Sequence, residues 1–168
     1  KIIISYLEQK IGKKKLINKL SLMHCVSSYP VKDVNANLKS IPFLIDNTDL
    51  NIGYSDHTIG STGCLGAVAL GAKIIEKHFT LDKKFSNFRD HSISADFTEL
   101  KEIVINIRKL EKQLGRVQKL ITKSEKILLK KVRRSAFSRH PIKKNEILTL
   151  KNIKFLRDQR NKNFLNLK

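Results

Sequence analysis

Short apolar runs alternate with helix-like segments through the first part of the chain. The runs KLSLMHCVSS (19–28), NIGYSDH (51–57) and AKIIEKHF (72–79) have strand length and end in small or polar residues, a pattern that predicts buried strands. Segments of helical spacing or helix-favouring composition lie around them, at 1–20, 34–44, 61–71 and 97–114. This order predicts a parallel sheet covered by helices, and the three units fit part of a βα barrel.

Glycine, proline and serine mark where the expected helices begin and end. Gly12 interrupts the first, and Pro42 closes the second because the residue before a proline is pushed out of the helical region. Ser61 is placed to cap the third and Gly71 to end it, while Gly115 stops the fourth.

The composition changes after Gly115. A linker with a helix at 124–131 is expected, followed by strands at 133–138 and 153–157 around a turn at 143–146. We expect this small unit to be incomplete, and its Asn- and Lys-rich end, from Asn161 onward, to be frayed. The predicted domains are 1–115, a linker helix at 116–131, and 132–168.

Length and composition are those of a globular protein. The 168 residues are 40% hydrophobic, with seven Gly and three Pro, and no stretch is apolar enough to span a membrane. Cys25 and Cys64 lie in apolar runs without a CxxC or metal-finger spacing, so we expect reduced, buried thiols and a cytoplasmic protein. The chain starts at Lys1 without a signal-peptide cleavage site, and we expect it to be a piece of something longer.

The formal net charge of +19 raises the question of nucleic-acid binding. Lys is spread along the whole chain, Arg is scarce, and aromatic residues are too few for a base-stacking platform. A lysine-rich solvated surface is therefore favoured, and we expect no nucleic-acid partner. An anionic small-molecule substrate also fits the charge.

Each predicted strand ends in reactive side chains. They are Ser27, Ser28 and Tyr29 on the first strand, Ser55, Asp56 and His57 on the second, and Glu76 and His78 on the third. Carboxyl ends of parallel strands form one rim, where enzymes of this class build their sites. Residues two apart share a strand face, which groups Ser55 with His57 and Glu76 with His78.

Two histidines on one rim suggest a metal. Neutral imidazole binds Mn, Zn, Fe or Ni, with oxygen ligands supplied by substrate, water or another part of the chain. A single strand-end histidine is more often a hydrogen-bonded structural residue. The hypothesis that His57 binds a metal therefore depends on the matching His78 on the next strand. His24 is expected to be structural and His140 to lie on the surface, whereas His91 is a further candidate for the rim.

Other chemistries lack their motifs. The chain has no GxGxxG or GKS/T phosphate loop and no GxSxG elbow. The segment NFRDHSISAD (87–96) is either a loop fixed by its own Asp and Ser side chains or a loop that places Asp90 over the pocket.

Five ordered motifs carry a resemblance to a known family. LMHCVSSYP, GYSDHTIG, ALGAKIIEKHFTLD, RDHSISAD and RRSAFS…IKKNEILTLKNIKFLR together resemble the C-terminal half of bacterial sialic acid synthases, the N-acetylneuraminate synthase family, from about Leu22 to Arg157. The resemblance implies an α/β fold: the last three strands of a (β/α)₈ TIM barrel, followed by an incomplete antifreeze-like (SAF) domain.

The resemblance also implies the activity. Members condense phosphoenolpyruvate with N-acetylmannosamine or a related amino sugar, release phosphate, use a divalent metal that is usually Mn²⁺, and work as domain-swapped homodimers. By this resemblance His57 and His78 are the metal ligands and catalytic residues. Substrate-binding roles fall to Ser27, Tyr29, Ser55, Asp90 and Arg157.

Two departures from the family pattern matter. Arg157 matches the arginine of an RPG element that reaches the partner's sugar site, but here Asp158 and Gln159 follow it. The family's phosphate-binding lysines lie on strands that would precede Lys1. We therefore expect a fragment that is inactive alone. The alternatives are a non-catalytic remnant that keeps only sugar or metal binding and a basic nucleic-acid-binding protein.

Overall fold

The structure is a computed structural model that describes residues 2–86 and 90–157. It divides into two compact units, residues 1–115 and 116–168. The first contains α1 (Ile2–Ile11), α2 (Lys13–Lys19), β1 (Ser21–Cys25), a 3₁₀ turn (Asp33–Asn35), α3 (Ser40–Asn47), β2 (Asn51–Asp56), α4 (Thr62–Ala69), β3 (Ile74–Lys77) and α5 (Phe97–Leu114).

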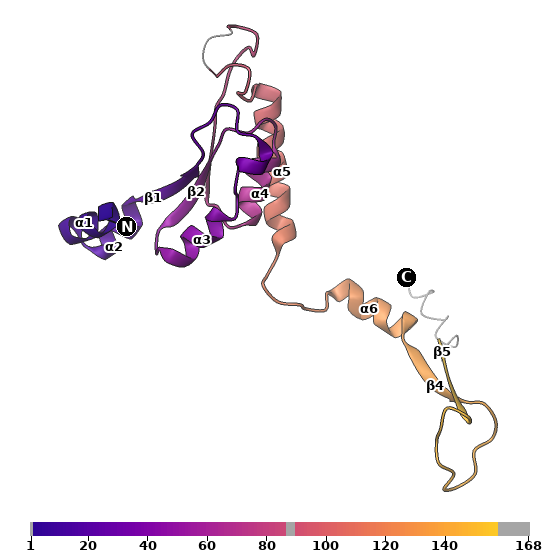
Figure 1. Ribbon diagram of the computed structural model, residues 1–168. Coiled ribbons are helices and arrows are strands. Elements are labelled where there is room, and N and C mark those ends of the chain that lie inside the picture. Colours follow the sequence, from indigo (N-terminus) through magenta and orange to yellow (C-terminus); the bar gives the residue numbers. More distant parts are fainter. Residues whose placement is uncertain (1, 87–89, 158–168) are drawn as a thin grey trace. The chain divides into compact units, whose positions relative to one another are not determined.

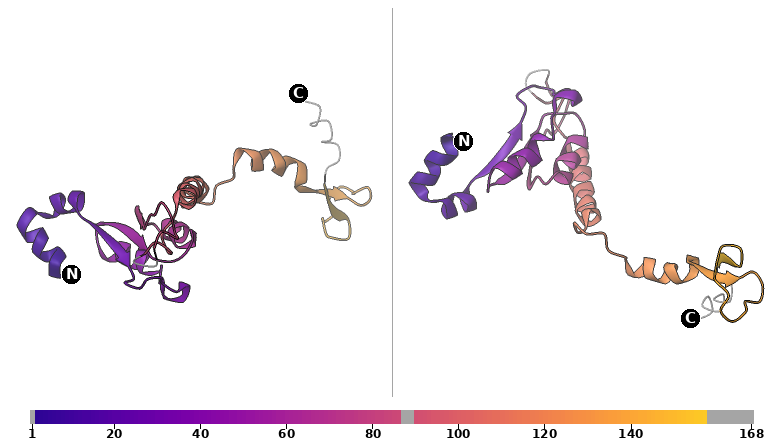
Figure 2. Two further views of the ribbon diagram at one scale, coloured as in Figure 1. Left: turned by 90° about the horizontal axis from the view of Figure 1, so that it is seen from above. Right: turned by 60° about the horizontal axis from the view of Figure 1, so that its bottom comes forward.

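A three-stranded parallel sheet in the order β1-β2-β3 forms the centre of the first unit (Figure 1). Helices α3 and α4 contact β2, and α5 packs along α4. The sequence prediction of parallel strands covered by helices is therefore confirmed. In a second set of views, α1 and α2 extend from the N-terminal end of β1, away from α4 and α5 (Figure 2).

The core lies between β2 and the helices. Ile52 and Tyr54 of β2 are buried against Ile41 of α3 and Ala67 of α4. These β2 side chains alternate with Gly53, Ser55 and His57, because successive side chains of a strand point to opposite faces. In β2 the side chains of Ile52 and Tyr54 thus pack against the helices, whereas those of Ser55 and His57 lie on the other face of the sheet.

The expected helix at 34–44 is wrong. Residues 33–35 form a 3₁₀ turn, Asn37 has a positive φ of 44°, and the α-helix begins only at Ser40. Pro42 lies in the first turn of α3 and does not close a helix. The first turn tolerates proline because its N–H groups have no partner within the helix.

The other helix boundaries follow the sequence. Gly12 (φ 80°) separates α1 from α2, and α5 ends at Gly115. Helix α5 begins with a capping box, in which Asp96 and Glu99 each accept a backbone N–H. Ser61 is the N-cap residue of α4, as expected, although its side chain makes no capping hydrogen bond.

The second unit contains α6 (Lys123–Val132) and the antiparallel pair β4 (Arg134–Ser138) and β5 (Ile153–Arg157). The helix and both strands agree with the sequence prediction. The segment predicted to be frayed lies outside the described residues, as do Asp158 and Gln159. No helix in the described part of the chain is long and apolar enough to cross a membrane.

Candidate functional site

Strands β2 and β3 bring two polar side chains into direct contact on the sheet face opposite the one that Ile52 and Tyr54 pack against the helices. Ser55 is the register partner of Glu76. The Ser55 hydroxyl donates a hydrogen bond of 2.6 Å to Glu76 Oε1 and lies 3.4 Å from His57 Nε2. The predicted grouping of Ser55 with His57 is therefore observed, and Glu76 joins it from the neighbouring strand.

The two histidines that follow these strands also converge. The ring centroids of His57 and His78 are 5.2 Å apart, with the planes inclined by 66°. His57 is buried, whereas the His78 side chain is 35% exposed. Parallel pairing in register brings the two rings together although 21 positions separate them.

Two more of the predicted residues surround this histidine pair. The Tyr29 ring centroid lies 4.3 Å from that of His57 and 5.7 Å from that of His78. Asp90 Oδ2 lies 3.6 Å from His78 Nδ1. Tyr29 is about half exposed, so the cluster opens to solvent on the side of Tyr29 and Asp90.

Two further predicted site residues are Ser27 and Arg157. Ser27 is exposed in the loop after β1. Arg157 ends β5 in the second unit, opposite Arg134. The structure thus brings together His57, His78, Ser55, Tyr29 and Asp90 within the first unit, and the roles of Ser27 and Arg157 stay predictions.

Hydrogen bonds assign which histidine nitrogens are free to bind a metal. His57 Nδ1 lies 2.9 Å from the carbonyl oxygen of Val26, so Nδ1 carries the proton and donates it. The Ser55 hydroxyl donates its hydrogen bond to Glu76 Oε1. The lone pair of His57 Nε2 therefore does not accept from Ser55. Asp90 Oδ2 lies 3.6 Å from His78 Nδ1, where it would orient an Nδ1–H and leave Nε2 to a ligand.

This donor set suits a divalent first-row metal, with the two Nε2 atoms as ligands and a carbonyl or carboxylate orienting each ring. Within residues 2–86 and 90–157, no three His, Cys, Asp or Glu side chains converge closely enough to hold a metal by themselves. A metal held at this pair would therefore need further ligands besides the two imidazoles.

On the opposite, helix-facing side of the same strand ends lies a buried ion pair that sequence reasoning missed. Lys77 Nζ and Asp56 Oδ2 are 2.9 Å apart, with side chains 4% and 0% exposed. Burial favours the neutral acid, but hydrogen bonds from Lys77, Thr58 and Cys64 together hold the pKa of Asp56 below its ordinary value. In the sequence Asp56 is recognisable only as a strand-end residue, and no local pattern distinguishes Lys77 from the other lysines of the chain.

The other histidines and cysteines have simpler roles. His24 hydrogen-bonds the carbonyl of Ala36, as expected of a structural residue, and His140 is exposed. His91 hydrogen-bonds Thr80 Oγ1. The two cysteines are free thiols, but the expectation that both are buried is wrong, because Cys25 is exposed at the end of the outer strand β1.

Comparisons with known proteins identify a family for this chain. The model of the NeuB family matches residues 3–119. The chain is 43% identical over 134 residues to an N,N'-diacetyllegionaminic acid synthase of Campylobacter jejuni, covering 80% of this chain and 40% of the relative. It is 38% identical over 139 residues to a pseudaminic acid synthase of the same organism, covering 82% and 40%.

A solved structure shares the fold. The crystal structure of an N-acetylneuraminic acid synthetase from Leptospira borgpetersenii superposes with a TM-score of 0.64 at 40% identity, covering 74% of this chain and 43% of that one. The chain thus spans about two fifths of the length of the relatives it matches. With a family match over most of its residues, this chain belongs to the NeuB family.

Proposed function

We propose that this chain carries the metal-binding and sugar-binding part of the active site of a nonulosonic acid synthase. The reaction is the condensation of phosphoenolpyruvate with N-acetylmannosamine or a related N-acetylated amino sugar, with release of phosphate. The names of the relatives support the class of product: one is a legionaminic acid synthase, one a pseudaminic acid synthase and one an N-acetylneuraminic acid synthetase.

The observation that carries the proposal is the convergence of His57 and His78, with ring centroids 5.2 Å apart and each Nδ1 beside an oxygen. Two imidazole rings this close would supply two nitrogen ligands to one divalent ion in this part of the site. An ion held by His57 and His78 would supply Lewis-acid chemistry toward the aldehyde oxygen of the open-chain sugar.

The chain's own residues bind and orient the substrates. Tyr29 offers a ring and a hydroxyl beside His57, and Asp90 offers a carboxylate to the sugar hydroxyls. Ser55 is the candidate contact to phosphoenolpyruvate, since its oxygen keeps two acceptor positions after donating to Glu76. Holding the sugar aldehyde against the enol carbon lowers the entropic part of the barrier.

The bond changes follow from the reactants. The enol carbon of phosphoenolpyruvate forms a C–C bond with the aldehyde carbon, water adds to the oxocarbenium carbon that results, and the tetrahedral carbon expels phosphate. Cationic and hydroxyl groups must stabilise the phosphate and carboxylate charges during these steps.

The architecture proposed for the complete enzyme extends the observed sheet. Strands β1, β2 and β3 would be the last three of a (β/α)₈ barrel, and the second unit part of an antiparallel SAF domain. In a domain-swapped homodimer, Ser27 would contact the sugar from the same chain and Arg157 would reach the partner's sugar. These assignments follow the family resemblance.

Isothermal titration calorimetry with N-acetylmannosamine, in the presence and absence of Mn²⁺, tests the proposal. We expect sugar binding that requires Mn²⁺ and is weakened about tenfold or more by Tyr29→Ala and by Asp90→Asn, the loss of roughly one good polar or ring contact. His140→Ala is the matched control, because His140 is exposed in the second unit.

Phosphate release is measured in parallel. We expect these 168 residues to release none from phosphoenolpyruvate and the sugar, because the lysines that the family uses to hold phosphoenolpyruvate are not among them. Sugar binding that is indifferent to Mn²⁺ and to both substitutions would contradict the proposal. Rapid turnover by the chain alone would contradict its role as one part of a larger site.

A further inference from the structure

A buried ion pair occupies the one position on each strand that lies between the candidate site residues. Asp56 stands between Ser55 and His57, and Lys77 stands between Glu76 and His78. Asp56 and Lys77 are register partners in the β2–β3 ladder. Their side chains meet on the helix-facing side, directly behind the face that carries the histidines.

The Asp56 carboxylate is fully engaged by neighbouring donors. Oδ1 accepts from the Tyr54 hydroxyl at 3.2 Å, the Thr58 N–H at 2.9 Å and the Thr58 hydroxyl at 2.7 Å. Oδ2 accepts from the Cys64 thiol at 3.1 Å and from Lys77 Nζ at 2.9 Å. The contacts from Thr58 are informative because Thr58 follows His57 directly.

The Lys77 ammonium completes the link between the strands. It donates to Asp56 Oδ2 and also to the carbonyl oxygen of Thr58. Lys77, which precedes His78, is therefore bonded to both neighbours of His57, to the side chain of Asp56 and to the backbone of Thr58. A side chain from β3 thus fixes the turn in which His57 sits.

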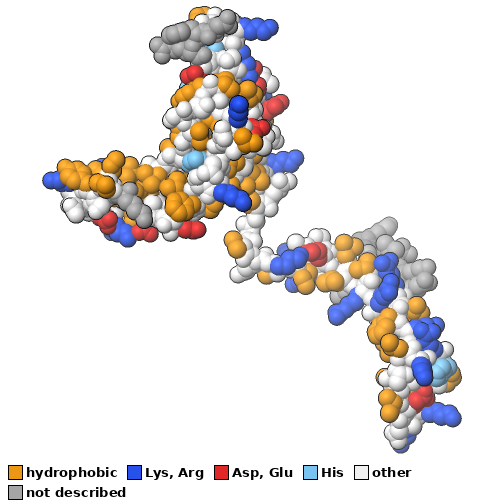
Figure 3. Space-filling model, viewed as in Figure 1, with side chains coloured by type: hydrophobic (Ala, Val, Ile, Leu, Met, Phe, Trp, Pro, Cys, Tyr) orange, Lys and Arg blue, Asp and Glu red, His pale blue; other side chains and the backbone are white. Residues whose placement is uncertain are grey.

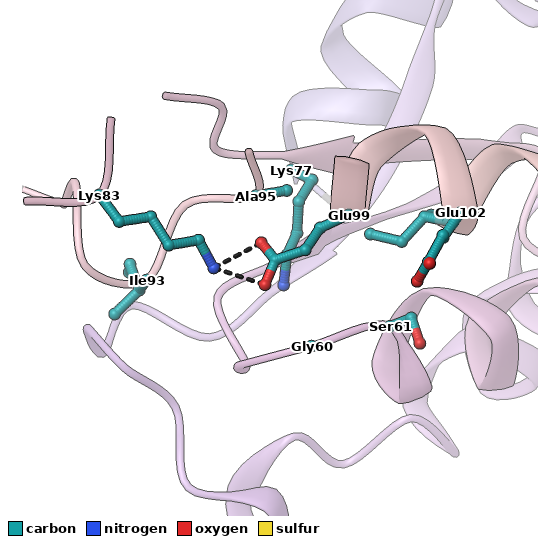
Figure 4. Close-up of a pocket in the computed structure, with 9 residues that line it drawn as sticks. Gly60, Ser61, Lys77, Lys83, Ile93, Ala95, Glu99 and Glu102 are labelled. Atoms are coloured by element: carbon teal, nitrogen blue, oxygen red, sulfur yellow. Dashed lines mark hydrogen bonds and ion pairs between the residues drawn. The ribbon is translucent and has the colours of Figure 1, made fainter. Parts of the chain in front are cut away.

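A second ion pair nearby offers a comparison. Figure 4 shows a pocket of about 200 Å³ that Lys77 lines together with Lys83, Glu99 and Glu102. Lys83 pairs with Glu99 across this pocket, with side chains 32% and 42% exposed. The Asp56–Lys77 pair is far more buried, with side chains 0% and 4% exposed, and its two residues directly precede His57 and His78.

We propose that the Asp56–Lys77 pair is a positioning device that sets the separation and orientation of His57 and His78 for their shared ion. This inference rests on the function proposed above. Metal–nitrogen distances near 2.1 Å require the two Nε2 atoms to be held within about 0.5 Å of the productive geometry. A buried charge pair between adjacent strands is stiff enough to do this, because any separation of the charges leaves them unpaired away from water.

The test compares Mn²⁺ affinity and ring geometry in matched variants. Removing Lys77 alone leaves a buried charge, so the main variant is the neutral double substitution Asp56→Asn/Lys77→Met, which keeps the volume and leaves no unpaired charge. Lys83→Met is the matched control, since it also removes a lysine from an ion pair in the same unit. Circular dichroism establishes that each variant is folded.

We expect the double variant to bind Mn²⁺ at least tenfold more weakly than the unsubstituted chain in an electron paramagnetic resonance titration, and Lys83→Met to change the affinity less than twofold. Independently of metal, the nuclear Overhauser effect between the His57 and His78 ring protons should be lost or clearly weakened in the double variant and kept in Lys83→Met.

Unchanged affinity together with an unchanged ring-to-ring effect in a folded double variant would overturn the inference. If the unsubstituted chain binds no Mn²⁺, the proposed function fails, and the ring-to-ring effect alone then decides whether the ion pair positions the two histidines. Loss of affinity that merely follows the loss of folded chain, with the same loss in Lys83→Met, would also count against a positioning role.

Discussion

At the scale of single residues, the two cysteines differ more than their sequence context suggests. Cys64 is fully buried, and its thiol donates to Asp56. Burial, and next the charge of Asp56, raise the pKa of the Cys64 thiol to about 12. Cys25 is exposed, and its sulfur lies 3.9 Å from His57 Nδ1.

Thiol labelling should therefore distinguish the two cysteines. Because the thiolate is the reactive form, we expect a disulfide reagent in native buffer to modify Cys25 and leave Cys64 unmodified. In denaturant both should react, since unfolding removes the burial and the nearby carboxylate. Mass spectrometry of the labelled chain gives the sites. Equal labelling of both cysteines in the native protein would show that the pocket around Asp56 is open.

The residues that could be predicted from sequence at this scale are those whose position follows from strand direction. Parallel strands end on the same edge, so Ser55, His57 and His78 were expected to meet, and they do. The Asp56–Lys77 pair could not be predicted because the sequence does not state the register between β2 and β3. Exposure of Cys25 depends on β1 being the outer strand of the order β1-β2-β3, which no local pattern reveals.

At the scale of elements, α4 approaches β2 through a glycine. A methyl group at Gly63 would lie 2.9 Å from Asp56 Oδ1 and 2.9 Å from Thr58 Oγ1. A methyl group at Gly66, in the same helix, would meet only the end of the Leu38 side chain. The first neighbours are fixed by hydrogen bonds, whereas the second can move.

Alanine at these two glycines gives a matched comparison. We expect Gly63→Ala to lower the free energy of unfolding by about 1–3 kcal/mol, because it overpacks a site that cannot yield. Gly66→Ala should be neutral or stabilising by up to about 1 kcal/mol, since alanine favours the helix and Leu38 can shift. Urea denaturation measures both. Equal effects of the two substitutions would contradict the close approach of α4 to Asp56.

Helix α6 depends on its capping box for a defined start. Thr122 is the N-cap, and the backbone N–H and hydroxyl of Thr122, followed by Lys119, hold the pKa of Glu125 below its ordinary value. A lowered folded-state pKa means that the cap contributes above the unfolded pKa, and that this contribution is lost as the pH falls through the folded pKa.

Titration of Glu125 by carbon NMR should show this directly. We expect its midpoint below that of an unstructured glutamate, and a move back toward that value in Thr122→Val, which removes the hydroxyl but keeps the backbone. A Glu125 midpoint that is ordinary in the unsubstituted chain would mean that α6 is not capped in this way.

The element boundaries that sequence reasoning placed wrongly have a physical explanation. Proline both ends helices and occupies their first turns, so Pro42 alone did not decide between a helix before it and the observed α3 around it. Glycine at Gly12 and Gly115 favours only the end of a helix, and the boundaries expected there were correct.

At the scale of the whole molecule, much apolar surface is exposed. Ile2 is 88% and Ile3 73% exposed, and Tyr6 is also exposed. Apolar side chains gather over α1 and α2 in the space-filling view (Figure 3). In the described residues, β1 and β3 each pair on one side only, and unpaired strand edges and apolar patches favour association.

We therefore expect the isolated chain to self-associate with rising concentration in analytical ultracentrifugation. Ile2→Ser/Ile3→Ser should shift the distribution toward the monomer, because it removes two of the most exposed apolar side chains. Val117→Ser also removes an exposed apolar side chain. It tests whether the loss of any exposed apolar side chain shifts the distribution in the same way. A strictly monomeric chain at all concentrations would show that these surfaces are tolerated in water.

The most direct test of a two-histidine metal site is nitrogen NMR of the histidine rings during titration with Zn²⁺, a diamagnetic ion that takes the same imidazole ligands. The geometry predicts that the Nε2 resonances of His57 and His78 move together and saturate at one ion per chain, while both Nδ1 atoms keep their protons and His140 is unaffected. Movement of only one of the two rings, coordination through Nδ1, or no change at either histidine would contradict it.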